Sequence, residues 1–291
     1  MSDAVLLVGH GSVEKAEDIP AFLANIRHGR PTPPAIVEEV TRRFLAIGGS
    51  PLLGISQAQA AALATRLGVR VEVGMRLFTP YARDVVRTLA AEGVTRLVSL
   101  PLAPFSTHLY NPLVAEACAA NGITCLPVGP WGEEPALVEA FAETVREAHA
   151  DGAHVVFTAH SLPLRVLSAG DRYEHEVRST MEAVARRVGC ARYSVAFQSQ
   201  GMDGGEWLGP DLPTTMARLV REGDEAVLFS AIGFLADHTE VLFDLDVEAR
   251  GQAEALGLRY HRAASLNARS SFVDALEALA RRALTGAAGA A

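Results

Sequence analysis

The sequence predicts an α/β protein made of two similar Rossmann-like halves, each a four-stranded parallel sheet flanked by helices, with a cleft between the halves. Short apolar runs alternate along the chain with amphipathic segments of roughly ten to eighteen residues, the pattern of a parallel sheet covered on both faces. Two of these apolar runs lead into a histidine in the same way, at His10 and at His160. The shared pattern indicates that the second half repeats the plan of the first.

Each expected strand is a short apolar run between turn signals, and each expected helix is a longer amphipathic segment. Strands are predicted at residues 4–8, 70–73, 96–101, 124–128, 154–158, 193–197, 226–230 and 258–260. Helices are predicted near residues 35–46, 56–67, 81–92, 111–121, 134–149, 174–188, 213–221, 237–255 and 271–284.

This alternation divides the chain into an N-terminal half over residues 1–128 and a C-terminal half over residues 129–265. A last helix, within residues 266–291, is expected to pack back on the N-terminal half. Ligands of open α/β sheets bind outside the carboxyl ends of the strands, so His10 and His160 are placed to face one cleft. One such histidine alone is more often a packed or capping residue. The pair at equivalent positions favours a site.

Composition excludes several classes of protein. The 291 residues include 26 Lys and Arg against 34 Asp and Glu, a formal net charge of −8, which argues against a nucleic-acid interface. Hydrophobic residues make up 49% and charged residues 21%, so a disordered, collagen-like or coiled-coil chain is excluded. No apolar stretch reaches the roughly 20 residues that span a bilayer, and none at the N-terminus fits a signal peptide. We therefore expect a soluble cytoplasmic protein with no integral membrane segment.

Cofactor motifs are absent from the sequence. The three cysteines, Cys118, Cys125 and Cys190, have no CxxC spacing, so neither a disulfide framework nor an iron–sulfur cluster can be drawn from them. We expect them to be small buried side chains in a reducing compartment. The chain also lacks the glycine-rich phosphate loops and the GxSxG nucleophile elbow. No organic cofactor is therefore expected.

Three carboxylates follow the apolar run of residues 226–236. Glu240, Asp244 and Glu248 are spaced by four residues, which on a helix stacks them along one stripe. Each like-charged pair at this spacing costs about 0.2 to 0.5 kcal/mol, so the stripe must be fully solvated or neutralised by a cation. An exposed acidic face is one explanation. A site is the other, because the stripe starts at a strand end and imidazole with carboxylate ligands suits Fe(II) or Zn(II).

A basic group lies early in the chain. Arg27, His28 and Arg30 precede Arg42 and Arg43. Guanidinium groups bind substrate carboxylates through forked hydrogen bonds, so this concentration in an acidic chain indicates an anionic ligand. The alternative is that these side chains are solvated helix ends, because two glutamates lie one turn before Arg42 and Arg43.

Several longer motifs occur in order between about Val5 and Leu284. They are Ile26-Arg27-His28-Gly29-Arg30, Ala46-Ile47-Gly48-Gly49-Ser50-Pro51-Leu52, Phe157-Thr158-Ala159-His160-Ser161-Leu162-Pro163, Gln198-Ser199, Trp207-Leu208-Gly209-Pro210-Asp211, Gly233-Phe234 and Asp237-His238-Thr239-Glu240. In this order and spacing they resemble the ferrochelatases, a family of class II tetrapyrrole chelatases, and within it the soluble bacterial enzymes. The resemblance implies two chelatase-type halves around a porphyrin cleft. It implies that Fe(II), as a substrate, is inserted into coproporphyrin III or protoporphyrin IX in haem biosynthesis, by a monomer whose partners are haem-pathway enzymes.

The resemblance also implies roles for particular residues. His160 and Glu240 match the family's essential His and Glu, which bind the metal and remove the pyrrole protons. Asp244 and Glu248 match the acidic continuation of that helix, which in the family contains a π-type turn and holds a second divalent metal. The positions that match those facing the porphyrin or its propionates are Arg27, Arg43, Ser50 and Tyr110.

One position departs from the family. Where ferrochelatases commonly carry Tyr or Met, this chain has His10, in a segment that resembles the start of the small sirohydrochlorin and cobalt chelatases. His10 is therefore a third candidate catalytic residue, either an axial ligand of the product iron or a second proton acceptor facing His160. It leaves a sirohydrochlorin or cobalt chelatase open as an alternative. The other alternative is a non-catalytic tetrapyrrole carrier on the same fold.

Overall fold

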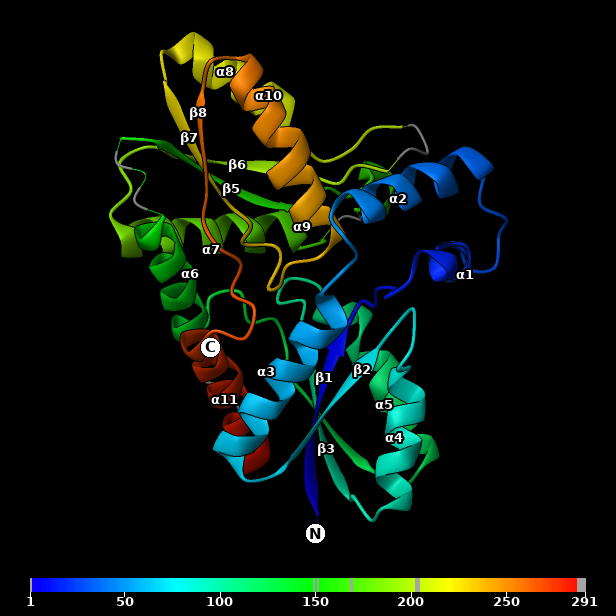
Figure 1. Cartoon of the computed structure of the whole chain (residues 1–291). Coiled ribbons are helices and arrows are strands. Elements are labelled where there is room, and N and C mark those ends of the chain that lie inside the picture. The colour runs from blue at the N-terminus through cyan, green and yellow to red at the C-terminus, as the bar shows by residue number, and fades with distance from the viewer. Residues whose placement is uncertain (1, 149, 151, 168–169, 202–204, 287–291) are drawn as a thin grey trace.

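The two halves form a lower and an upper lobe in Figure 1, each built on one parallel sheet. The structure is a computed structural model, and it describes residues 2–148, 150, 152–167, 170–201 and 205–286. Its strands are β1 (Asp3–Gly9), β2 (Arg70–Met75), β3 (Arg96–Pro101), β4 (Thr124–Pro127), β5 (His154–His160), β6 (Tyr193–Gln198), β7 (Ala226–Ser230) and β8 (Arg259–Arg262). The sheet orders are β2-β1-β3-β4 and β6-β5-β7-β8, so the second sheet repeats the first. The predicted fold of two similar α/β halves is confirmed.

Helices lie between the strands as predicted, with one addition. They are α1 (Ile19–Ile26), α2 (Pro34–Ala46), α3 (Leu52–Leu67), α4 (Ala82–Ala91), α5 (Asn111–Ala120), α6 (Pro135–Glu147), α7 (Tyr173–Val188), α8 (Leu212–Glu222) and α11 (Ser270–Thr285). Sequence reasoning missed α1, because its eight residues give little periodicity and include Pro20. Proline is tolerated there because it lies in the first helical turn, where the missing N–H has no helical partner.

The segment predicted as one helix over residues 237–255 contains a π-helical turn. α9 (Thr239–Phe243) continues into the π-helix η4 (Asp244–Ala249) and then into α10 (Arg250–Ala255). π-helical turns inside α-helices are rare and occur frequently at functional sites. The π-type turn that the family resemblance implies is therefore present, and it starts at Asp244.

Both faces of the N-terminal sheet are covered. Leu6 and Val8 of β1 pack with Val86 of α4, whereas Leu7 packs with Leu63 of α3, and all five side chains are fully buried. Successive residues of a strand point to opposite faces, so an unbroken apolar strand requires helices on both sides. This layering leaves the carboxyl ends of the strands as the place for polar groups.

The C-terminal helix α11 returns to the N-terminal half. Arg66 of α3 forms an ion pair with Asp274, and Nη2 of Arg96 donates a hydrogen bond to the carbonyl oxygen of Leu284 at 2.6 Å. The division of the chain at residues 128 and 265 stays a prediction. The last residues of the predicted terminal segment, 287–291, lie outside the described residues.

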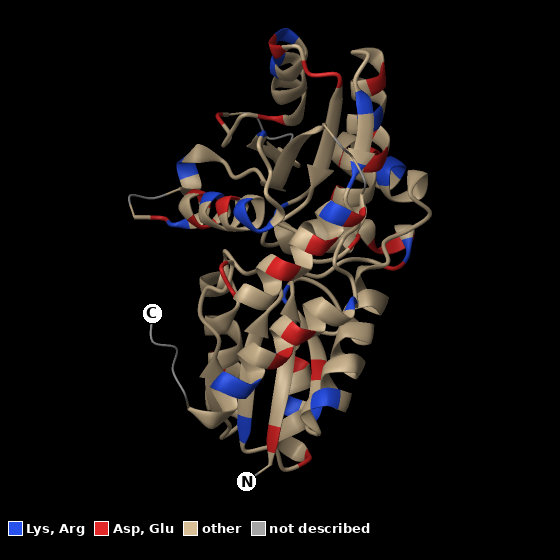
Figure 2. Cartoon of the chain, turned by 90° about the vertical axis from the view of Figure 1, so that its left-hand side faces the viewer, with Lys and Arg blue, Asp and Glu red and all other residues tan. Residues whose placement is uncertain are grey.

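Charged residues of both signs are spread over both halves of the chain (Figure 2), which has a net charge of −8. Cys118 is buried and Cys125 and Cys190 are half-buried, and all three are free thiols. In the described part of the chain, no helix is both long and apolar enough to cross a lipid bilayer.

Candidate active site

His160 ends β5, whose preceding residues are buried. Its Nδ1 donates a hydrogen bond to the carbonyl oxygen of Ser161. A carbonyl oxygen only accepts, so the proton of the neutral ring lies on Nδ1 and the lone pair on Nε2. The hydroxyl of Tyr173 donates to the carbonyl oxygen of His160 at 2.8 Å, which fixes the backbone at the strand end. The imidazole is 37% exposed, so its Nε2 is presented to a ligand rather than buried.

Glu240 lies in the first turn of α9 and faces this histidine. Its Oε2 is 3.4 Å from Nε2 of His160. That oxygen is buried, and no hydrogen bond from the described residues reaches it. An imidazole nitrogen with a lone pair and a carboxylate oxygen both accept hydrogen bonds, so a proton or a metal cation between them satisfies both.

The charge of Glu240 is set by its neighbours. Loss of contact with water on its own raises the pKa of this carboxyl group. The nearby His160, His238 and His10, together with Ser199, oppose this and leave the pKa below its usual value. Glu240 is therefore an anion at neutral pH, even though the surrounding protein removes most of its contact with water.

His10 stands after the end of β1, in the electrostatic neighbourhood of His160 and Glu240. Its Nδ1 is 3.3 Å from the hydroxyl oxygen of the buried Tyr110, and burial raises the pKa of Tyr110 to about 12. The residue retains exposed surface, yet desolvation by the surrounding protein outweighs the attraction of Glu240 and lowers the pKa of His10 to about 4. His10 is therefore a neutral imidazole at pH 7, able to bind a metal.

The acidic continuation of α9 is neutralised by an arginine from the N-terminal half. Arg43 of α2 lies 3.4 Å from Oδ1 of Asp244 and 3.7 Å from Oε1 of Glu248, and its guanidinium stacks over Phe243 at 5.0 Å. The chain itself thus places a cation beside two carboxylates of the acidic stripe, and the same guanidinium also pairs with Glu39 at 2.7 Å. Ser199 donates a further hydrogen bond to Oδ2 of Asp244 at 2.5 Å.

Asp244 makes the stability of the protein depend on pH. Burial is the main cause that raises its pKa to about 7, against the opposing effects of Ser199 and Arg43. Between about pH 4 and pH 7 the folded state therefore binds more protons at this site than the unfolded state, and the free energy of unfolding falls as the pH rises. In metal-free buffer, urea titrations from pH 4 to pH 8 are expected to show a shallower fall for Asp244→Asn than for the wild type. Equal slopes contradict this assignment.

The remaining predicted site residues lie on the N-terminal half. Arg27 directly follows α1 and is half-buried, and Ser50 follows the turn after α2. The hydroxyl oxygen of Ser50 is buried without a hydrogen-bond partner among the described residues, which leaves it available to a ligand. The structure thus brings His10, Tyr110, His160 and Glu240 together, and groups Arg43 with Asp244 and Glu248.

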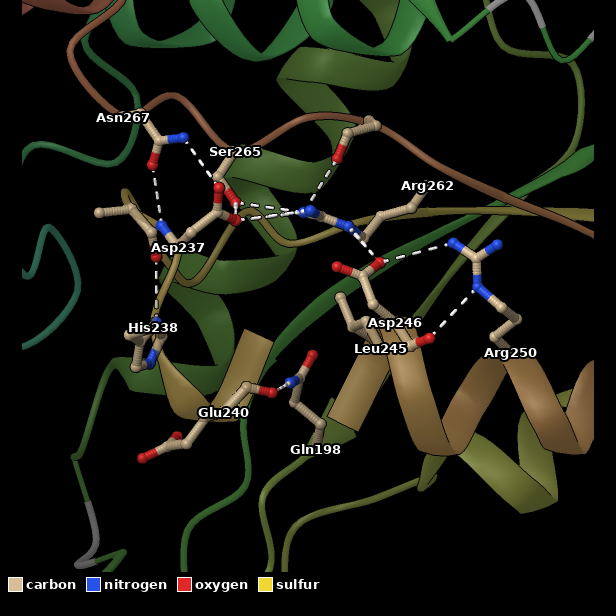
Figure 3. A network of polar contacts seen from close by, with 12 residues as sticks. Gln198, Asp237, His238, Glu240, Leu245, Asp246, Arg250, Arg262, Ser265 and Asn267 are labelled. Atoms are coloured by element: carbon tan, nitrogen blue, oxygen red, sulfur yellow. Dashed lines mark hydrogen bonds and ion pairs between the residues drawn. The ribbon is translucent and has the colours of Figure 1, made fainter. Parts of the chain in front are cut away.

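Sequence reasoning missed His238 and Ser199 as site residues. His238 precedes α9 (Figure 3) and donates from Nδ1 to the carbonyl oxygen of Ala236 at 3.0 Å. Its ring packs on Phe234. The available signal was position, because Ser199 directly follows the end of β6 and His238 directly precedes the helix that carries Glu240. Among the described residues, no group of at least three His, Cys, Asp or Glu side chains is arranged to hold a metal ion.

Known proteins resemble this chain over nearly its whole length. A family model described as Ferrochelatase matches residues 2–284. A ferrochelatase from Acidobacterium capsulatum is 38% identical over 97% of this chain and 94% of its own length. Relatives named coproporphyrin III ferrochelatase, from a Geobacillus species and from Bacillus subtilis, are 34% and 32% identical, each over 94% of both chains.

The fold is also shared with a solved structure. SirB from Bacillus subtilis with Fe3+ has a TM-score of 0.63 at 14% identity, and the match covers 99% of this chain and 97% of that one. At this identity the likeness shows the fold alone. The family model and the relatives above 30% identity show more than the fold: this chain is a member of the ferrochelatase family.

Proposed function

We propose that this chain inserts Fe(II) into coproporphyrin III, with His160 and Glu240 receiving the metal and the pyrrole protons. The observation that carries the proposal is the pair of unshared lone pairs on His160 Nε2 and Glu240 Oε2, 3.4 Å apart. Insertion removes the two N–H protons of the ring as Fe(II) enters, so the site needs a proton acceptor next to groups that attract a cation. Imidazole and carboxylate together suit Fe(II).

The two residues have different tasks. Glu240, with its lowered pKa, holds a proton weakly but stabilises positive charge beside it. His160 presents the Nε2 lone pair and accepts the two pyrrole protons one after the other as a general base, releasing the first to solvent before it takes the second. The anionic Glu240 stabilises the imidazolium that forms each time.

The ring is held by its carboxylate arms. Arg27, Arg43, Ser50 and Tyr110 are the groups we assign to the porphyrin and its propionates. A ring carboxylate that binds Arg43 competes with Asp244 and Glu248, which the guanidinium contacts in the structure. The carboxylate pair that this competition releases is our candidate for a second divalent metal.

Coproporphyrin III is favoured over protoporphyrin IX by its larger number of carboxylate arms. Besides Arg27 and Arg43, the N-terminal half presents Arg76, whose guanidinium lies 5.9 Å from the ring of Tyr110. No carboxylate of the described residues forms an ion pair with Arg76. Relatives named for coproporphyrin III at 31–34% identity point to the same ring.

An anaerobic metal-insertion assay tests the proposed function. Wild-type protein is given Fe(II) with coproporphyrin III, protoporphyrin IX or sirohydrochlorin in parallel, and the loss of the free-ring spectrum is followed. Turnover of coproporphyrin III at the highest kcat/KM is expected. Preference for protoporphyrin IX overturns the choice of ring. Tight binding of a ring without turnover overturns the enzyme and leaves a carrier.

His10 favours a second candidate, a sirohydrochlorin or cobalt chelatase, because a neutral imidazole at this place can ligate the metal of the product. For either ring we expect His10→Ala to change the absorption spectrum of the bound product, since an axial ligand is lost. The measurement is a spectrum of the enzyme–product complex beside the initial rate. An unchanged spectrum together with an unchanged rate contradicts both roles of His10.

The remaining properties follow from the same proposal. A cytoplasmic monomer that passes its product to another haem-pathway enzyme is the form we assign to the protein. Three free thiols fall short of the four that hold an iron–sulfur cluster, so we assign none.

A further inference from the structure

A polar network surrounds Asp237, two residues before the start of α9 (Figure 3). Asp237 accepts hydrogen bonds on both carboxylate oxygens, from Ser265 Oγ at 2.6 Å and from Asn267 Nδ2 at 2.8 Å. Its backbone N–H donates to Oδ1 of the same Asn267 at 2.9 Å. The turn that leads to His238 and Glu240 is therefore held at both its backbone and its side chain.

One guanidinium joins this turn to the π-helix. Nε of Arg262, the last residue of β8, donates to Oδ1 of Asp246 at 2.7 Å, and its Nη2 lies 3.4 Å from Oδ1 of Asp237. Two residues earlier, on the same face of the strand, Tyr260 donates its hydroxyl to the carbonyl oxygen of Leu245 at 2.7 Å. β8 thus contacts both ends of the segment that carries Glu240. Arg262 is only 15% exposed, so its two ion pairs are shielded from solvent.

The network also reaches the N-terminal half. Gln59 of α3 is fully buried and donates to the carbonyl oxygen of Asn267 at 2.8 Å. The N–H of Asn267 donates to the carbonyl oxygen of Leu235 at 2.9 Å, and its φ of 47° lies in the left-handed region. A non-glycine residue keeps that conformation only when its surroundings hold it there. The start of α9 is therefore fixed relative to the half that carries His10.

We propose that Arg262 is a positioning residue for iron insertion. By holding Asp237 and Asp246 together it keeps the turn before α9 and the π-helix in the shape that points the Glu240 carboxylate at Nε2 of His160. Without the guanidinium, the two carboxylates lose their shared cation and the π-helix is free to relax towards an α-helix, which rotates Glu240. The inference rests on the proposed function, and Arg262 acts through the backbone because, among the described residues, its hydrogen-bond partners include neither His160 nor Glu240.

The test compares Arg262→Gln with Arg259→Gln in the full chain. Arg259 lies on the same strand with its side chain 69% exposed, which makes it a matched control. A displacement of about 1 Å at a reacting group costs on the order of 100-fold, so Arg262→Gln is expected to lower kcat for Fe(II) insertion by about 10- to 100-fold. The KM for the porphyrin and the binding of metal-free porphyrin, measured by fluorescence quenching, are expected to stay within about two-fold. Arg262→Lys can restore one of the two ion pairs but not both contacts of a guanidinium group, so its kcat is expected to lie between that of the wild type and that of Arg262→Gln.

Asp246→Asn is the second variant, because it keeps the shape of the side chain and removes only the charge that Nε of Arg262 contacts. It is expected to lower kcat in the same direction and by less. Wild-type kcat in folded Arg262→Gln overturns the inference. So does a fall of kcat, porphyrin binding and melting temperature together with no gain from Lys, which is the sign of a structural role only. A wild type that inserts no iron overturns the proposed function first, and the inference with it.

Discussion

Glu240→Gln is expected to lose about two to four orders of magnitude in kcat for iron insertion, the range that general acid–base catalysis contributes. The amide keeps the size of the side chain but carries no charge, so the imidazolium of His160 and the incoming Fe(II) lose their anionic partner. The amide nitrogen is also a donor, which can fill the lone pair of His160 Nε2 at the 3.4 Å contact. The variant therefore loses both the charge and the free acceptor.

The measurement is steady-state kinetics with separate values of kcat and KM. His160→Ala is expected to fall equally far, and the double variant to fall little further, because residues that act as a unit are not additive. Glu254→Gln, an exposed carboxylate on α10, is the control and is expected to match the wild type. If Glu240→Gln keeps half of the wild-type kcat, Glu240 has no role in the mechanism.

The main features of the fold could be predicted because each is a local pattern. β1 is a short apolar run directly before His10, and β5 is a similar run that ends at His160. A continuous apolar run of this length is typical of a parallel strand buried on both faces. Parallel topology then brings the carboxyl ends, and with them the histidines, towards one place. Glu240 could be added because it begins a helix directly after such a strand.

The partner of the acidic stripe could not be predicted, because it comes from far along the chain. The spacing of Asp244 and Glu248 called for full solvation or a cation, and a metal ion was the candidate cation that the sequence offered. The structure places Arg43 beside both carboxylates, and the second metal stays a prediction. Both arginines of α2 lie over the ring of Phe243 in α9, but only Arg43 forms ion pairs with Asp244 and Glu248. Which of the two reaches the carboxylates depends on how the halves pack, and no local pattern encodes that.

The network around Asp237 escaped sequence reasoning for a related reason. Its members are ordinary loop residues, such as Ser265 and Asn267, whose identity carries no motif. The π-helix that the network holds was expected only from the resemblance, since a spacing of four residues by itself predicts a regular α-helix. Hydrogen bonds across a sequence separation of about thirty residues become visible only in the folded chain.

Gly233 supports the backbone beneath His160, and Gly233→Ala is expected to reduce both stability and turnover. A Cβ at this position would lie 2.6 Å from Cα of Ala159 and 2.7 Å from its Cβ. Ala159 is fully buried in β5, so the contact cannot be relieved by a flexible side chain. The N–H of Gly233 also donates to the carbonyl oxygen of Thr158 at 2.9 Å, which ties the two segments together.

Overpacking of this kind costs about 1 to 3 kcal/mol in the free energy of unfolding, and urea denaturation of Gly233→Ala measures it. Gly251→Ala is the matched control with the opposite sign. It lies in α10 with no atom within 4 Å of an added Cβ, so it is expected to stabilise the protein by about 0.5 to 1 kcal/mol. Since Gly233 is next to the backbone of His160 rather than its ring, kcat in folded Gly233→Ala is expected to fall while porphyrin binding persists. Wild-type stability and kcat in this variant would show that β5 can shift without moving the imidazole away from Glu240.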